Sequence, residues 1–71
     1  MKKTIVEKFG KRVRQLRIER GLTQEGLGEK CGLDLTYIGR IERGEQNSSL
    51  IVAEAIAKGL KVSLEELFKG L

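Results

Sequence analysis

Apolar residues recur every three or four positions along much of the chain, which is the spacing of one face of an α-helix. In the first segment this apolar stripe consists of Ile5, Phe9, Val13 and Leu16. The stripe predicts an amphipathic helix over about residues 4–20, and Gly21 follows it as a terminator. Because no stretch alternates apolar and polar residues as a half-buried strand does, we expect an all-α protein.

Capping residues and glycines divide the rest of the chain into four further short helices. Each begins with a residue whose side-chain oxygen can accept a hydrogen bond from the first helical turn, and these residues are Thr23, Asp34, Ser49 and Ser63. The four helices are expected to extend to about Cys31, Arg43, Lys58 and Phe68. Ser63 and Glu66 have the spacing of a capping box. The expected architecture is a compact five-helix bundle that forms a single domain over residues 1–71.

The composition argues against several kinds of chemistry. The 71 residues include no histidine and one cysteine, Cys31, so we expect no histidine-based triad, no zinc site and no internal disulfide. Two carboxylate pairs, Glu25 with Glu29 and Glu65 with Glu66, fall on short exposed helix faces without a predicted pocket. We therefore expect no enzyme activity, no cofactor and no small-molecule ligand, and Cys31 is interpreted as a small core residue.

Charge is unevenly distributed along the chain. Lysine and arginine number 14 against 10 aspartate and glutamate residues, and residues 1–20 hold eight basic but only two acidic side chains. A basic segment in a chain with a pI near 9.5 favours a polyanionic partner, with a solvated basic face as the alternative. The longest apolar run, residues 50–53, is too short to span a bilayer. We expect no membrane association and a cytoplasmic location.

The second and third helices are expected to be separated only by Gly32 and Leu33, because Asp34 already caps the third helix. So short a connection through a glycine forces a steep angle between the two helices, which is typical of a helix-turn-helix unit. A compact helical hairpin of another kind is the alternative that this spacing leaves open.

One pattern of residues covers nearly the whole chain: 21–25 (GLTQE), 27, 32–33, 37–38, 41–45 (IERGE), 47 and 49–50. This pattern resembles the phage repressor and Cro type of helix-turn-helix domain, the XRE-like family. Within that family, residues 33–34, 36–38, 41–44 and 46–47 are similar to the controller proteins of restriction-modification systems. The resemblance implies a transcription regulator that binds a palindromic operator in double-stranded DNA as a homodimer, with RNA polymerase as a candidate further partner. A prophage-type repressor, and an antitoxin or adaptor module that binds mainly protein, are the alternatives.

The resemblance also implies roles for individual residues. The third helix of such a domain lies in the major groove, and we expect Leu35, Thr36 and Arg40 on its outward side to contact bases. Arg40 can donate two hydrogen bonds to a guanine, whereas Leu35 offers only an apolar contact. Controller proteins commonly carry arginine in place of Leu35 and small residues around Arg40, so the operator sequence does not carry over from them.

Phosphate contacts and a structural ion pair are implied in the same way. The expected phosphate contacts come from the start of the second helix, from the third helix and from the segment after it: Thr23, Gln24, Tyr37, Arg43, Gln46 and Asn47. Arg17 and Glu42 match residues that form a partly buried salt bridge in related repressors. This pair would fix the third helix against the first.

The fourth helix is apolar on nearly all sides, which predicts that both of its faces are buried. The face expected in the core consists of Leu50, Ala53, Ile56, Ala57 and Leu60. The opposite face contains Ile51, Val52, Ala55 and Gly59, and a 71-residue chain has too little material to cover it. We therefore expect a homodimer formed through the fourth and fifth helices, with the candidate interface residues Ile51, Val52, Ala55, Val62, Leu67 and Phe68.

Overall fold

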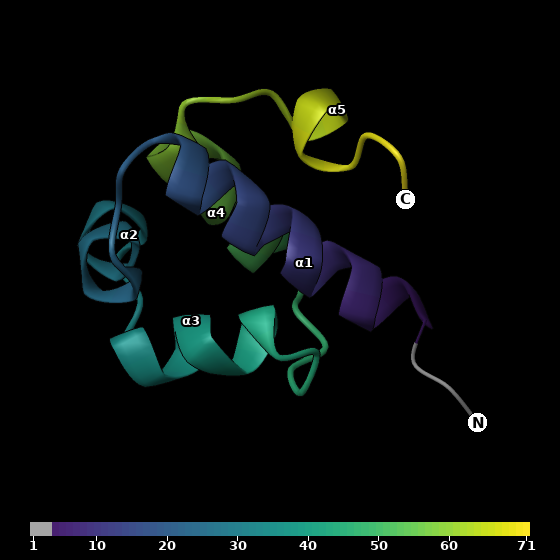
Figure 1. Ribbon diagram of the computed structural model, residues 1–71, viewed down its shortest axis with the longest axis horizontal. Coiled ribbons are helices and arrows are strands. Elements are labelled where there is room, and N and C mark those ends of the chain that lie inside the picture. Colours follow the sequence, from purple (N-terminus) through teal and green to yellow (C-terminus); the bar gives the residue numbers. More distant parts are fainter. Residues whose placement is uncertain (1–3) are drawn as a thin grey trace.

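The computed structural model describes residues 4–71, and within them the chain forms five α-helices and no strand, as the sequence predicted. The helices are α1 (Thr4–Glu19), α2 (Gln24–Cys31), α3 (Leu35–Glu42), α4 (Leu50–Leu60) and α5 (Leu64–Leu67). Each of α1 and α2 packs against both α3 and α4, and α5 packs against α4. Figure 1 shows α1 crossing the middle of the molecule, with α3 on one side of it and the short α5 on the other.

Every helix after α1 begins at the capping residue that the sequence predicted. The side chains of Thr23, Asp34, Ser49 and Ser63 accept hydrogen bonds of 2.9 to 3.2 Å from backbone N–H groups in the first helical turn. The capping box at Ser63 is only half formed, because the carboxylate of Glu66 accepts a 2.9 Å hydrogen bond from Arg12 on α1 instead. This ion pair, which the local spacing does not reveal, fastens α5 to α1.

Four helices end one or two residues from their predicted ends, and α1 at Glu19 and α5 at Leu67 end one residue early. Glu42 is the last residue of α3, and Arg43 is its C-cap. The fourth helix continues past Lys58 to Leu60, because the side chain of Leu60 is fully buried and its carbonyl accepts a 2.6 Å hydrogen bond from Arg20. Lys61 then ends α4 in the left-handed conformation, with φ at 61°.

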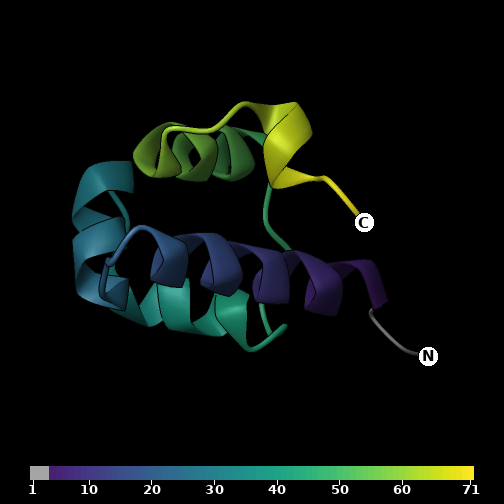
Figure 2. The same ribbon diagram turned by 45° about the horizontal axis from the view of Figure 1, so that its top comes forward.

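A single hydrophobic core lies between the layer that contains α1 and α3 and the layer that contains α4 and α5 (Figure 2). Its buried members are Phe9, Val13, Leu16, Leu27, Ile38, Ile41, Ala53, Ile56, Ala57, Leu60 and Leu67. The predicted stripe of α1 is confirmed for its last three residues. Ile5 is exposed, because it lies on the rim of an open groove between α1 and the start of α4.

Three residues of α4 and α5 lie elsewhere than predicted. Leu50 was expected in the core but is 82% exposed, because it stands at the first position of α4 on the rim of the same groove. Gly59 was expected on the outer face but is buried against α2, where an added Cβ would lie 2.7 Å from Sγ of Cys31. Leu67 was expected at a dimer interface but is 0% exposed, so its core position excludes contact with a second copy.

Candidate nucleic-acid interface

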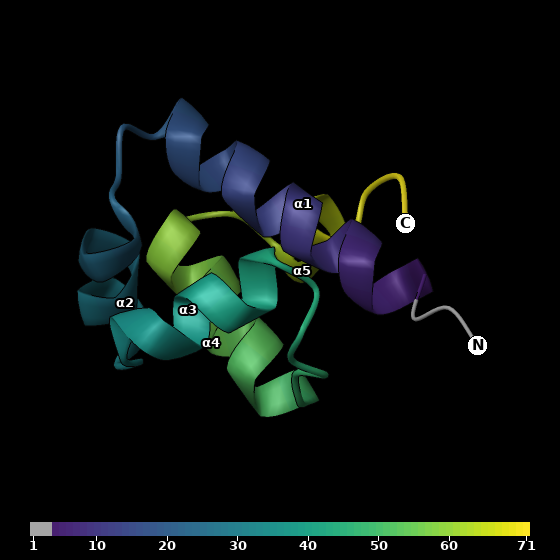
Figure 3. The same cartoon turned by 60° about the horizontal axis from the view of Figure 1, so that its bottom comes forward.

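The turn between α2 and α3 depends on two glycines. Gly32 takes the left-handed conformation, φ 74°, that ends α2, and the N–H of Leu33 donates a 2.8 Å hydrogen bond to the carbonyl of Gly28. A side chain on Gly28 would collide with the carbonyl oxygen of Leu33. The third helix therefore starts directly against α2, and Figure 3 shows the two helices meeting at a steep angle. The predicted helix-turn-helix arrangement is present.

One side of α3 is buried and the other is open. Ile38 and Ile41 are fully buried in the core, which fixes the rotation of the helix about its axis. Leu35, Thr36 and Arg40 are exposed on the other side, and we call these three residues the α3 surface. Within residues 4–71, Arg40 forms no ion pair, so its guanidinium is free to bind an external acceptor. A helix presented in this way has one face open to a partner, and the base contacts expected of Leu35, Thr36 and Arg40 stay a prediction.

A buried polar network holds the C-terminal end of α3. The side chain of Glu42 is only 2% exposed, and its two oxygens accept hydrogen bonds of 2.6 and 3.0 Å from Arg17 on α1. Arg17 also donates a 2.8 Å hydrogen bond to the carbonyl of Leu22. The side-chain amide nitrogen Nε2 of Gln24, at the start of α2, donates a 3.1 Å hydrogen bond to Oε1 of Glu42. The network therefore joins α1, α2 and α3 at one point.

This network changes what Gln24 can offer to a phosphate. The sequence placed Gln24 among the phosphate contacts, but its half-buried side chain is directed to the carboxylate of Glu42. Its backbone N–H, in the first turn of α2, is still among the free donors that suit an anion at a helix N-terminus. Sequence reasoning missed this third member of the network, because the contact between Gln24 and Glu42 spans 18 positions of the chain.

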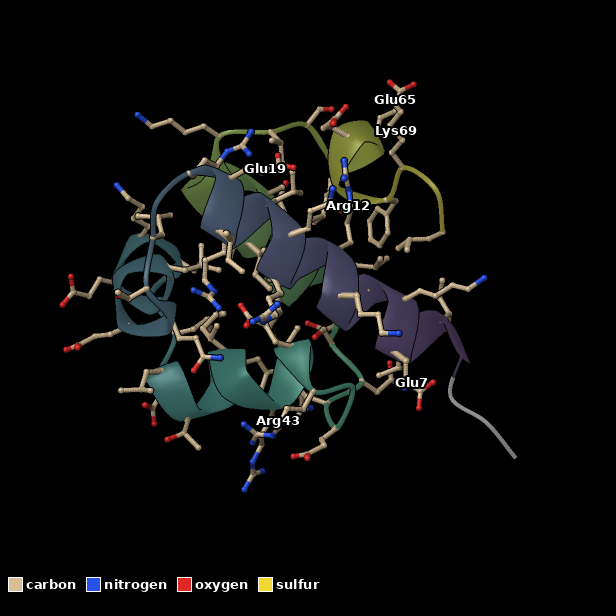
Figure 4. All side chains as sticks on the ribbon, in the orientation of Figure 1. Glu7, Arg12, Glu19, Arg43, Glu65 and Lys69 are labelled. Atoms are coloured by element: carbon tan, nitrogen blue, oxygen red, sulfur yellow. The ribbon has the colours of Figure 1, made fainter. Side chains whose placement is uncertain are left out.

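Arg43 lies at the end of α3 and forms an ion pair with Glu45. Its Nε and Nη2 donate hydrogen bonds of 3.1 and 3.3 Å to the two carboxylate oxygens of Glu45, and both side chains are more than half exposed. The hydrogen bond from Arg43 lowers the pKa of the Glu45 carboxyl below its ordinary value. Figure 4 shows Arg43 on the α3 side of the molecule and Arg12, Glu65 and Lys69 near α5.

The remaining expected phosphate contacts lie on three different segments, and Gln46 and Asn47 line the groove between α1 and the start of α4. Thr23 is exposed at the start of α2, and its hydroxyl oxygen accepts the capping hydrogen bond from the N–H of Gly26. Tyr37 is half-buried and packs against the core. In the segment between α3 and α4, Asn47 is exposed and Gln46 is half-buried.

Two further observations concern other kinds of site. Residues 4–71 contain no group of three or more histidine, cysteine, aspartate and glutamate side chains placed to hold a metal ion. None of the helices in this part of the chain is both long and apolar enough to cross a membrane.

Comparison with known proteins places this arrangement in a family. The helix-turn-helix family model matches residues 13–67. The chain is 40% identical over 65 residues to the control protein C.MunI of Mycoplasma sp, which covers 90% of this chain and 88% of that protein. It is 45% identical over 60 residues to the control protein C.BamHI of Bacillus amyloliquefaciens, which covers 83% of this chain and 74% of that protein.

Solved structures agree with these sequence comparisons. The restriction-modification controller protein C.AhdI from Aeromonas hydrophila superposes with a TM-score of 0.85 at 44% identity, over 87% of this chain and 94% of that one. The fold and the α3 surface define a helix-turn-helix protein, and the chain belongs to the helix-turn-helix family. It is accordingly a DNA-binding transcription regulator rather than an enzyme.

Proposed function

We propose that this chain is a controller protein of a restriction-modification system, which binds a palindromic operator as a homodimer. The observation that carries the proposal is the exposed α3 surface, held in place by a buried ion pair, in a chain whose relatives include controllers matched along most of their length. The immunity repressor of Bacillus phage phi105 is 40% identical over 58 residues, which cover 40% of that protein. A prophage-type repressor is therefore the alternative within the family.

In the proposed complex α3 lies in the major groove. Arg40 is the residue that reads a guanine, because its free guanidinium can donate to O6 and N7 together. Thr36 and Leu35 contact neighbouring bases, the latter only through an apolar contact with a thymine methyl group. Backbone N–H groups at the start of α2, together with residues of α3 and of the segment after it, are proposed to bind the flanking phosphates: Thr23, Gln24, Tyr37, Arg43, Gln46 and Asn47.

A binding experiment tests this proposal. Purified protein is mixed with a randomised duplex pool at about 0.15 M salt, where attraction to random DNA is weak, and the bound fraction is sequenced. We expect a palindrome whose half-sites are about one turn of DNA apart. Replacing Arg40→Ala should relax the preference at one position of each half-site by about 1–3 kcal/mol. Arg14→Ala, which removes an exposed arginine from α1, is the matched control. An unenriched pool would refute sequence-specific binding and favour a module that binds mainly protein.

The proposed homodimer rests on an apolar patch at the start of α4. Leu50 and Ile51 are 82% and 80% exposed, and Phe68 lines the adjoining groove. Val52, Ala55 and Val62 are half-buried and complete the proposed interface. Neighbouring large apolar side chains that are this exposed favour a protein partner, and a two-fold dimer places two α3 helices on one side of the DNA.

Sedimentation measurements test the dimer. Ile51→Glu should convert a dimeric protein into a monomer, because each interface would receive two buried carboxylates. Ile18→Glu changes an exposed isoleucine of α1 outside the patch and should leave the dimer intact. A wild-type protein that sediments as a monomer at concentrations that saturate DNA would contradict the proposal. RNA polymerase is a further proposed partner, to be tested by transcription from the selected operator.

A further inference from the structure

The segment after α3 holds Glu45 in a fixed position. Gly44 takes the left-handed conformation, φ 77°, and its N–H donates to the carbonyl of Ile41 at 3.0 Å. The N–H of Glu45 donates to the carbonyl of Arg40 at 2.8 Å. These two hydrogen bonds form a Schellman motif, which satisfies carbonyl groups at the end of the helix. The backbone of Glu45 is therefore set by the end of α3 itself.

The guanidinium of Arg43 also lies close to α3 at Gly39. Gly39 has no side chain, and a Cβ built there would lie 3.0 Å from Nη1 of Arg43. The guanidinium thus rests over the backbone of α3 while Nε and Nη2 donate to Glu45. A carboxylate and a phosphate bind an arginine fork in the same geometry, so both compete for the same donors.

We infer that Glu45 is an affinity-setting residue, which competes with the DNA backbone for the guanidinium of Arg43. The inference rests on the proposed function, in which Arg43 is a phosphate contact. A phosphate can take both donors only after it displaces the Glu45 carboxylate. The displaced carboxylate then lies close to the DNA and attracts a cation, which offsets part of the counterion release that drives binding. Glu45 therefore weakens the hold on the backbone at every site and leaves the readout of bases by Arg40 in place.

The test compares Glu45→Gln with a matched control, Glu65→Gln. Both variants remove one negative charge from an exposed side chain, but Glu65 lies on α5, away from α3 (Figure 4). Binding to a random duplex is measured between about 0.05 and 0.2 M salt. At the lower salt concentration Glu45→Gln should bind roughly fivefold more tightly than wild type, the effect of one unit-charge contact at about 4 Å in water, and the gain should shrink as the salt concentration rises. The plot of log affinity against log salt should steepen by up to about 0.9, the value for one phosphate contact. Glu65→Gln should match wild type in both respects.

A double-mutant cycle separates competition from a general effect of charge. In the presence of Arg43→Gln, the additional change Glu45→Gln should alter affinity less than twofold, because the competed group is gone. A gain that persists without Arg43, or an equal gain from Glu65→Gln, would overturn the inference. If wild type binds DNA and Glu45→Gln binds no better, the inference alone fails. If wild type binds no duplex even at low salt, the proposed function fails and the inference falls with it.

Discussion

Replacing Glu42 tests the polar network that supports α3. The Glu42 carboxylate accepts two hydrogen bonds from Arg17 and one from Gln24. The side chain of Arg17 is 12% exposed and that of Glu42 is 2% exposed, so water cannot substitute for a missing partner. Glu42→Ala leaves a buried guanidinium without its carboxylate and the half-buried side-chain amide of Gln24 without its acceptor. Its effect should therefore be large for a single substitution.

The structure sets the size of this effect. Removing one partner from a buried ion pair costs about 3–5 kcal/mol, because the remaining charge stays uncompensated. A chain of 71 residues has a total stability of roughly 4–11 kcal/mol. In a domain of this size 1 kcal/mol changes the melting temperature by about 4–8 °C, so Glu42→Ala should lower it by roughly 12 °C or more. Glu42→Gln keeps the shape but loses the charge and turns one acceptor oxygen into an NH2 donor that faces another donor, so it should cost at least about 1.5–3 kcal/mol.

Thermal and urea denaturation followed by circular dichroism measure these changes. Replacing both partners, with Arg17→Met and Glu42→Leu together, should restore most of the stability, since apolar groups of similar volume often substitute for a buried pair. A melting temperature for Glu42→Ala within about 2 °C of wild type would refute the reasoning and show that the pair is effectively solvated. If the restored double variant binds DNA more weakly than wild type, the network positions α3 as well as stabilising the fold.

Three further predictions follow from close contacts in the fold. Gly59→Ala should cost about 1–3 kcal/mol, because its Cβ would lie 2.7 Å from Sγ of Cys31, and Cys31→Ala in the same chain should recover most of that loss in thermal denaturation. Burial raises the pKa of the Cys31 thiol, so at pH 8 an alkylating reagent should react more slowly with folded protein than with protein unfolded in urea; equal rates would contradict this. Because the pKa of this thiol is higher in the folded protein than in the unfolded protein, folding favours the protonated form. The contribution of the thiol to stability is therefore present at neutral pH and is lost as the pH rises past its ordinary pKa. Gly39→Ala should raise the stability by up to about 1 kcal/mol, because the new methyl group meets mainly the movable end of Arg43; a lower melting temperature would show that Arg43 cannot move aside.

The sequence by itself determined the local structure. The stripe of apolar residues in α1 and the four capping residues predicted the number, order and starting points of the helices. Gly32 and Leu33 predicted the short turn between α2 and α3. These features depend on backbone conformation and on hydrogen bonds between residues a few positions apart, and both are written in neighbouring residues.

Only the tertiary structure decided the surroundings of several residues on α4 and α5. Leu50 and Gly59 exchanged the environments that helical periodicity predicted, and Leu67 proved to lie in the core rather than on a dimer surface. Periodicity identifies the faces of a helix, but the direction in which the helix crosses its neighbours decides which face they bury. For α4 the predicted core face was correct at Ala53, Ile56, Ala57 and Leu60, but both faces are apolar, so periodicity alone did not place the residues near its two ends.

The candidate site divides in the same way. The outward positions of α3 followed from its helical period, because Ile38 and Ile41 mark the opposite side. The engagement of Gln24 with Glu42 and of Glu66 with Arg12 depends on contacts between residues 18 and 54 positions apart. Such contacts exist only after the helices have packed, since packing brings distant side chains within hydrogen-bonding distance and removes the water that would otherwise compete for them.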